Sequence, residues 1–155
     1  MRVTAKVDYA MRSLLQLTDA GGKAISSFVK AETISEAEDI PLKFLEGILR
    51  QLRLSGMVAA QRGSDGGYRL DRDPSEISVA DVIRAIDGPL AEVRGSKPEQ
   101  LLYEGSSENL GEVWIALRAS MREVLEKTNL TQIRKGQFNT QIRRLNATPN
   151  SRKRR

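Results

Sequence analysis

The fold of this chain is decided by residues 40–70, which read IPLKFLEGILRQLRLSGMVAAQRGSDGGYRL. Pro41 suits the first turn of a helix, because the N–H that proline lacks would have no partner there. Gly56 is typical of the residue just beyond a helix end. Between them, leucines recur at helical spacing, at Leu42, Leu45, Leu49 and Leu52. The stretch therefore predicts a helix over 42–54.

The rest of this stretch predicts a β-hairpin. Residues 57–60 and 68–70 have the composition of short strands, and residues 62–67 form a turn rich in glycine, serine and aspartate. A phosphate-binding loop is disfavoured for residues 63–67, because a helix with Gly-Lys-Ser/Thr should follow such a loop and here a strand follows.

Two further helices are expected before residue 40. A short one is predicted over 29–37, where alanine and isoleucine recur every third residue. A longer amphipathic helix, ending near residues 19–22, is indicated by apolar residues at Val3, Val7, Ala10, Met11, Leu14, Leu15 and Leu17. Two short helices separated by three or four residues predict a helix-turn-helix, and the hairpin that follows is expected to be its wing.

The second half of the chain predicts a dimerisation helix. Ser78 is expected to cap a helix over 79–86, and residues 90–109 are expected to form a loop with at most a short helix. Beyond the loop, an apolar seam carries more surface than one small domain can cover, which indicates pairing with a second copy. The predicted dimerisation residues are Leu110, Val113, Trp114, Leu117, Met121, Val124 and Leu125. An effector pocket between this helix and residues 90–103 is the alternative for Trp114.

The expected fold class is therefore mainly α with a small β-hairpin wing, that is, a winged helix-turn-helix with a long C-terminal helix. We divide the chain into a DNA-binding domain over 1–73, a linker helix, loop and dimerisation helix over 74–133, and a basic tail over 134–155. Disorder is expected past about Lys135, although Ile142 and Leu145 could form a helical turn.

Composition excludes several kinds of chemistry. The 155 residues include no Cys and no His, so the chain cannot form a disulfide, a thiolate or imidazole metal site, or a His-based triad. No apolar stretch is long enough to cross a bilayer, and the start lacks a secretory signal, so we expect a cytoplasmic protein. The net charge of +5 is local: residues 129–155 hold eight basic and no acidic side chains, while residues 1–128 hold 17 basic against 20 acidic. DNA binding by the folded part must therefore depend on where its cations lie.

The sequence resembles the Rrf2 family of winged-helix bacterial transcription regulators, and the residues of its motifs are most similar to those of actinobacterial members. The resemblance spans residues 1 to about 133, and is carried by MRVTAK at 1–6, IPLKFLE at 40–46, ILRQLR at 48–53, GMV at 56–58, RG at 62–63, GGY at 66–68, ISVADVI at 77–83, DGP at 87–89 and VW at 113–114. It implies a homodimer that places a recognition helix over 42–54 in the major groove and a wing in the minor groove of double-stranded DNA.

The resemblance also implies the site. DNA contacts are expected at Arg2, Thr4, Lys6, Leu42, Lys43, Phe44, Glu46, Arg50, Arg62, Gly63 and Ser64. The physical chemistry agrees, since Glu46 can accept from a cytosine amine and Lys43 can donate to guanine or to phosphate. Arg62 on a narrow turn can enter an A·T-rich minor groove.

One feature departs from the family. Many members bind an iron-sulfur cluster through three cysteines in the loop before the long helix, whereas residues 92–111 contain none here. We therefore expect no cofactor and place the chain in a cysteine-free branch. There the resemblance to cysteine-metabolism repressors suggests a metabolite or protein effector linked to sulfur supply, and a repressor that acts on a palindromic operator.

Less specific interpretations remain open. The wing could be a plain solvated hairpin, Lys43 and Glu46 a simple surface pair, and Phe44 partly core. The basic end could be a floating charged tail. An alternative function is a protein-interaction module that recruits a metabolic enzyme, with DNA binding secondary. Catalysis by the chain itself is disfavoured, because no paired carboxylates or Ser-x-x-Lys motif stands out.

Overall fold

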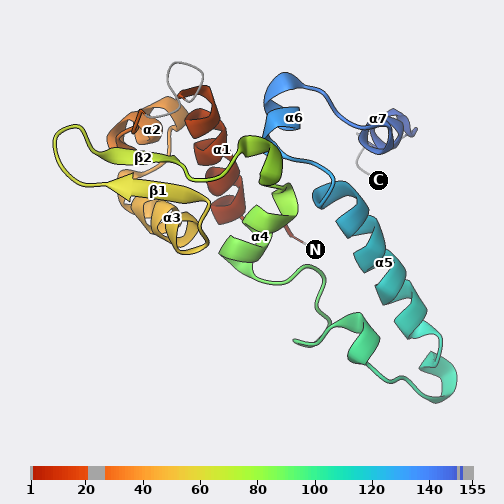
Figure 1. Ribbon diagram of the computed structural model, residues 1–155. Coiled ribbons are helices and arrows are strands. Elements are labelled where there is room, and N and C mark those ends of the chain that lie inside the picture. Colours follow the sequence, from red (N-terminus) through yellow and green to blue (C-terminus); the bar gives the residue numbers. More distant parts are fainter. Residues whose placement is uncertain (1, 21–26, 150, 152–155) are drawn as a thin grey trace.

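The computed structural model describes residues 2–20, 27–149 and 151, and shows a helical body with a two-stranded hairpin on one side and a long helical arm on the other (Figure 1). The elements, in chain order, are α1 (Ala5–Ala20), α2 (Ala31–Glu38), α3 (Leu42–Leu54), β1 (Val58–Gln61), β2 (Gly67–Leu70), α4 (Val79–Asp87), α5 (Leu110–Leu125), α6 (Leu130–Lys135) and α7 (Thr140–Ala147). Short 3-10 turns occur at Pro74–Glu76, Pro98–Gln100 and Gly105–Ser107. The expected fold class is confirmed.

Helices α2 and α3 form the helix-turn-helix. Asp39 adopts the left-handed conformation with φ 49° and ψ 51°, and so reverses the chain. The turn is closed because the N–H of Ile40 donates to the carbonyl of Ser35 at 3.0 Å, while the Ser35 hydroxyl donates to the carbonyl of Ile40 at 2.6 Å. The predicted bounds of α3 are confirmed.

The end of α3 has two backbone hydrogen bonds that define a Schellman motif. Met57 N–H donates to the carbonyl of Leu52, and Gly56 N–H donates to that of Arg53, both at 3.0 Å. Gly56 has a φ of 73°, which suits glycine and few other residues. Leu52 and Met57 are both buried, so the motif joins α3 firmly to the first strand.

One apolar core holds the body together. The buried side of α3, at Leu45, Ile48, Leu49 and Leu52, packs against α1 and α4. Ile77, Val82 and Leu130 belong to the same core. The division expected after residue 73 therefore falls within one shared core.

The wing consists of β1 and β2, paired antiparallel with Val58 opposite Leu70 and Gln61 opposite Gly67. Val29 was expected in the second helix, but it lies beside β2 and exchanges two backbone hydrogen bonds of 2.8 Å with Tyr68. Gly67 permits this approach, because a Cβ there would lie 2.3 Å from the Val29 carbonyl oxygen. The helix consequently starts later, at Ala31.

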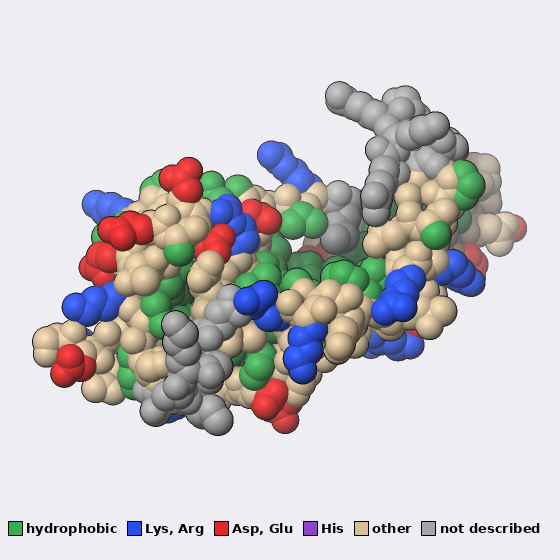
Figure 2. Space-filling model, turned by 90° about the horizontal axis from the view of Figure 1, so that it is seen from above, with side chains coloured by type: hydrophobic (Ala, Val, Ile, Leu, Met, Phe, Trp, Pro, Cys, Tyr) green, Lys and Arg blue, Asp and Glu red, His purple; other side chains and the backbone are tan. Residues whose placement is uncertain are grey.

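The arm comprises the loop 88–109 and α5. None of the 16 residues of α5 is buried. Of the predicted dimerisation residues, Leu110, Val113 and Leu117 are exposed, whereas Trp114, Met121, Val124 and Leu125 are half-buried. Seen from above, apolar side chains also line the hollow between the body and the arm (Figure 2).

The basic tail differs from the expectation of disorder, because residues 140–147 form α7. Asn139 is the physical reason: its side-chain Oδ1 accepts from the N–H of Ile142 at 2.9 Å and so caps the helix start. Ile142 is half-buried and Leu145 is 43% exposed. The four cations at 152–155 lie outside the described residues.

Candidate nucleic-acid interface

The outer side of α3 is a stripe of four residues that faces away from the core. Lys43, Gly47, Arg50 and Leu54 are spaced three or four apart and are all exposed, with Leu54 at 73%. We call this stripe the reading face. It is the part of the helix-turn-helix that is free to meet a partner.

A hollow of about 440 Å³ lies between the start of α1 and the reading face. It is lined by Lys6, Lys43, Phe44, Gly47, Arg50, Gln51 and Leu54. We call it the α1 hollow. Three of its residues are cations that the sequence predicted to contact DNA, so the structure brings residues 43 and 50 together with residue 6 from another helix.

A second hollow, of about 390 Å³, lies between α3 and the wing. It is lined by Glu46, Arg50, Arg53, Ala60, Gln61, Arg62, Gly67 and Tyr68. We call it the wing hollow. Arg50 lines both hollows, which makes one continuous surface from the start of α1 across α3 to the wing.

The cations of this surface differ in their partners from four cations that lie on α4, on α5 and just beyond α5. Within the described part of the chain, no ion pair forms at Lys6, Lys43, Arg50, Arg53 or Arg62. Arg84, Arg118, Arg122 and Lys127 are each paired with a carboxylate. Five unpaired cations against Glu46 give this surface a positive field, even though residues 1–128 are slightly acidic as a whole.

Phe44 occupies an intermediate position between core and surface. Its side chain is 46% exposed, and its ring meets that of Tyr9 edge-on with centroids 5.8 Å apart. Tyr9 in turn lies under the Arg12 guanidinium at 5.7 Å. Phe44 is therefore held by α1 while half of it stays available.

Other residues that the sequence predicted to contact DNA make contacts within the chain. Thr4 Oγ1 accepts from the N–H of Val7 at 3.2 Å and donates to Asp87 at 2.8 Å, so it caps α1 and joins it to α4. Leu42 is half-buried against the core. Arg2 lines a separate hollow of about 110 Å³ next to Met121.

The wing tip is exposed at Arg62, Gly63 and Ser64. Gly63 has a φ of 108°, and its carbonyl accepts from the N–H of Gly66 at 3.0 Å, which closes the turn. A Cβ on Gly66 would lie 2.3 Å from the carbonyl oxygen of Gln61, so the tight turn requires glycine there. The turn therefore presents Arg62 on a narrow finger.

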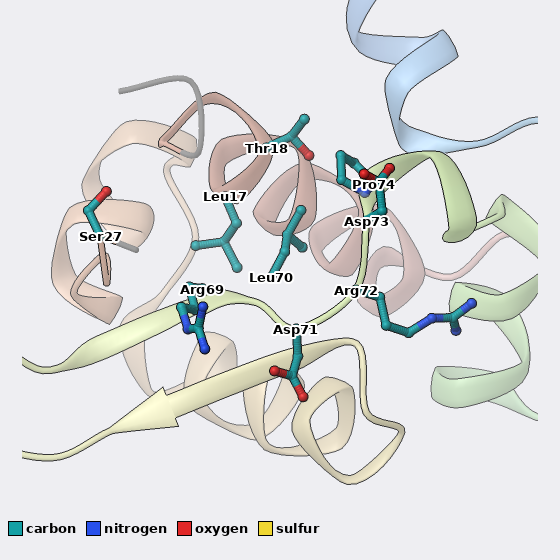
Figure 3. A pocket seen from close by; sticks show the side chains of 9 residues that line it. All are labelled: Leu17, Thr18, Ser27, Arg69, Leu70, Asp71, Arg72, Asp73 and Pro74. Carbon is teal, nitrogen blue, oxygen red and sulfur yellow. The ribbon is translucent and has the colours of Figure 1, made fainter. Parts of the chain in front are cut away.

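The wing is anchored to the body through β2. Figure 3 shows Leu70 and Leu17 pointing toward one another between β2 and α1, while Arg69 and Asp71 leave the strand on its other side. The Arg69 guanidinium lies 5.2 Å from the centre of the Phe28 ring. These contacts fix the wing relative to α1, and thereby relative to α3.

A larger hollow of about 470 Å³ surrounds this anchor, and several polar groups on its rim have contacts within the chain (Figure 3). Thr18 donates to the carbonyl of Leu14 at 2.9 Å, and Arg72 donates to that of Glu76 at 2.7 Å. Hydrogen bonds from Ser75 hold the pKa of Asp73 below its usual value. Arg69 and Asp71 also line this hollow, and Nε of Arg69 is buried without a hydrogen-bond partner among the described residues.

Arg53 and Gly47 are among the residues of this surface that were missing from the sequence prediction. Arg53 lines the wing hollow, and its spacing of seven from Glu46 could have placed it on the same side of α3. Gly47 lies in the α1 hollow, and an unexplained glycine in a helix interior was the signal available for it.

An iron-sulfur site does not fit these residues. The chain has no Cys or His, and no three Asp or Glu residues of the described segments gather as a metal site would require. No helix among the described residues is long and apolar enough to cross a membrane.

Comparison with known proteins agrees with this geometry. Residues 3–136 match the family model described as "Rrf2: Iron-dependent Transcriptional regulator". The HTH-type transcriptional regulator Rv1287 of Mycobacterium tuberculosis is 47% identical over 136 residues, which cover 88% of this chain and 83% of that protein. The HTH-type transcriptional regulator CymR of Bacillus subtilis is 28% identical over 133 residues, covering 86% and 89%.

Two solved structures have the same architecture. The structure of CymR, the global cysteine regulator of B. subtilis, superposes with a TM-score of 0.73 at 25% identity, covering 89% of this chain and 99% of that one. That of T. potens IscR superposes with a TM-score of 0.69 at 27% identity, covering 90% and 93%. The winged helix-turn-helix and the long C-terminal helix are common to these proteins and this chain.

Proposed function

Because the chain belongs to the Rrf2 family of transcriptional regulators, we propose that it is a homodimeric repressor that binds a palindromic operator through α3 and the wing. One observation carries the proposal: Arg50 joins the α1 hollow and the wing hollow into one surface whose cations have no ion-pair partner among the described residues. Unpaired cations on an exposed helix and an adjacent finger suit a phosphate backbone.

Some residues of this surface suit contacts with DNA bases, and others suit contacts with the phosphate backbone. The start of α3 presents Lys43 and Glu46, which can donate to guanine and accept from cytosine in the major groove. Arg62 on the wing can enter the neighbouring minor groove. Lys6 and Arg53, on either side of the reading face, suit the two flanking phosphate strands.

The arm supports the homodimer. Val113 is 56% and Leu117 46% exposed, on a helix that buries no residue against its own chain. A second copy of α5 would remove these side chains from water. Two-fold symmetry then predicts two half-sites on one face of the duplex, about one helical turn or a small multiple apart.

The signal is proposed to be a metabolite or a protein partner linked to sulfur or cysteine supply. The support is similarity to the protein described as the global cysteine regulator of B. subtilis. The iron dependence in the family description does not carry over, because the chain lacks the thiolate and imidazole ligands of a cluster. Action on chromosomal DNA also implies a cytoplasmic location.

The test is a titration of the purified full chain against genomic fragments in the presence of excess competitor DNA. Retention of particular promoter fragments that share a palindrome supports the proposal. Binding that is equal for all fragments and disappears as salt rises would overturn sequence-specific regulation, because phosphate attraction alone behaves in this way. Loss of operator binding on adding a sulfur metabolite would support the proposed signal.

A further inference from the structure

Gly47 is a glycine that the protein itself does not need. It lies inside α3, where glycine is the weakest helix former apart from proline. Its φ is not positive, and a Cβ added there would meet no protein atom within 4 Å. Every other glycine of the described segments has a positive φ or a neighbouring atom within that distance.

The position of Gly47 on α3 indicates why a side chain is absent there. It is the midpoint of the reading face, opposite the buried Leu45 and Leu52. The exposed side chains of Lys43 and Arg50 flank it, about one helical turn away on either side. The reading face therefore has a notch between two cations, on the side of α3 that faces away from the core.

We propose that Gly47 is a specificity-determining position, at which the backbone of α3 approaches the edge of a base pair in the major groove. The inference rests on the proposed function. The major groove is about 12 Å wide and a helix with its side chains is about 10–12 Å across, so the fit leaves little slack. An outward shift of ~1 Å would take a base contact of about 2.9 Å beyond hydrogen-bonding distance.

Because of the notch, we expect a side chain introduced at position 47 to reduce affinity for the specific DNA sequence, and a larger side chain to reduce it more. The affinity for DNA of other sequence should not change. Phosphate contacts from Lys6 and Arg53 come from long side chains that can follow a small displacement, whereas short base contacts cannot. Alanine and leucine both favour the helix more than glycine does, so substitution here does not weaken the fold. The effect is thus separable from stability.

The experiment compares full-length wild type with Gly47→Ala and Gly47→Leu. Two labelled duplexes of equal length are used, one bearing the palindrome selected by the wild type and one with scrambled half-sites. Gly111→Ala is the matched control, since Gly111 is helical, lies in α5, and has only the Tyr103 ring near its added Cβ, at 3.6 Å. Thermal unfolding of each variant is recorded alongside.

We expect Gly47→Ala to lower affinity for the palindrome by about tenfold or more and Gly47→Leu to lower it further. Affinity for the scrambled duplex should stay within about twofold, and the unfolding midpoint should not fall. The inference is overturned if both variants bind the palindrome like the wild type, or lose affinity equally for both duplexes. A wild type that does not distinguish the two duplexes would instead overturn the proposed function.

Discussion

The guanidinium of Arg12 in α1 holds the last residue of α2, with its Nε 2.8 Å from Oε2 of Glu38. The same guanidinium donates to the Glu38 backbone carbonyl, and Gln16 donates to the second carboxylate oxygen. The hydrogen bond that Arg12 donates to the Glu38 carboxylate is the largest influence that raises the pKa of Arg12. Because Asp39 follows at once in the left-handed conformation, this contact fixes the point where the chain turns into α3.

Replacing Glu38 should therefore loosen the helix-turn-helix. We expect Glu38→Ala to lower the thermal unfolding midpoint by several degrees, because it leaves Arg12 and Gln16 without their shared acceptor. Glu36→Ala is the matched control, since Glu36 is an exposed residue of the same helix and forms no ion pair with described residues. Equal midpoints for the two variants would contradict the role given to Glu38.

Substitution of Arg53 tests whether the wing hollow binds a DNA phosphate. Arg53→Ala should weaken binding to every duplex to a similar degree and reduce the slope of log affinity against log salt by about 1. The control is Lys127→Ala, because Lys127 is paired with Glu123 just beyond the end of α5 and lines neither hollow. An unchanged salt slope for Arg53→Ala would remove Arg53 from the interface.

Substitution of Leu117 tests whether two copies of the chain pair through the arm. Leu117→Glu should convert the dimer to a folded monomer, because the side chain is 46% exposed in the single chain and a charge can be desolvated only at high cost. Sedimentation equilibrium measures the change. Leu145→Glu in α7 is the same substitution at a similar exposure of 43%, and should remain dimeric. A dimeric Leu117→Glu protein would place the contact elsewhere.

Sequence alone predicted the parts of the fold that local signals determine. Helix 42–54 has a proline at its start and a glycine at its end, and the predicted Ser78 cap is a local contact, since its partner Asp81 lies three residues away. Val29 was misplaced in a helix because its pairing with Tyr68 is a contact between segments almost forty residues apart. Helix α7 was missed because its composition is polar, although the capping Asn139 is a local signal.

The candidate site was predictable to a similar extent. The resemblance located Lys43, Glu46, Arg50 and Arg62, and the structure places all four around two joined hollows. Periodicity alone cannot tell that Lys43 and Arg62 have no ion-pair partner among the described residues while Arg84 and Arg122 share Glu126, because ion pairing depends on how α4 and α5 meet. The dimer contact stays a prediction, and of its seven residues three are exposed and four are half-buried in the single chain.

Glu126 makes the attachment of the arm pH-dependent. Hydrogen bonds from Arg122 and Arg84 hold the pKa of Glu126 below its ordinary 4.5. A carboxyl whose pKa is lower in the folded state stabilises the fold above its unfolded pKa, and this stabilisation is lost as pH falls through the folded value. The gap in unfolding midpoint between wild type and Glu126→Gln should therefore be steady above about pH 4.5 and close below it. A gap that persists under acid conditions would contradict this assignment.

The account depends most on α3 and the wing acting together on one duplex, and hydroxyl-radical footprinting on the selected palindrome tests this directly. For the wild type we predict two protected half-sites on one face of the DNA, each with protection in the adjacent minor groove. Arg62→Ala should keep the half-sites, lose the minor-groove protection, and bind about 1–3 kcal/mol more weakly. Protection without boundaries, or an Arg62→Ala footprint identical to that of the wild type, would contradict the account.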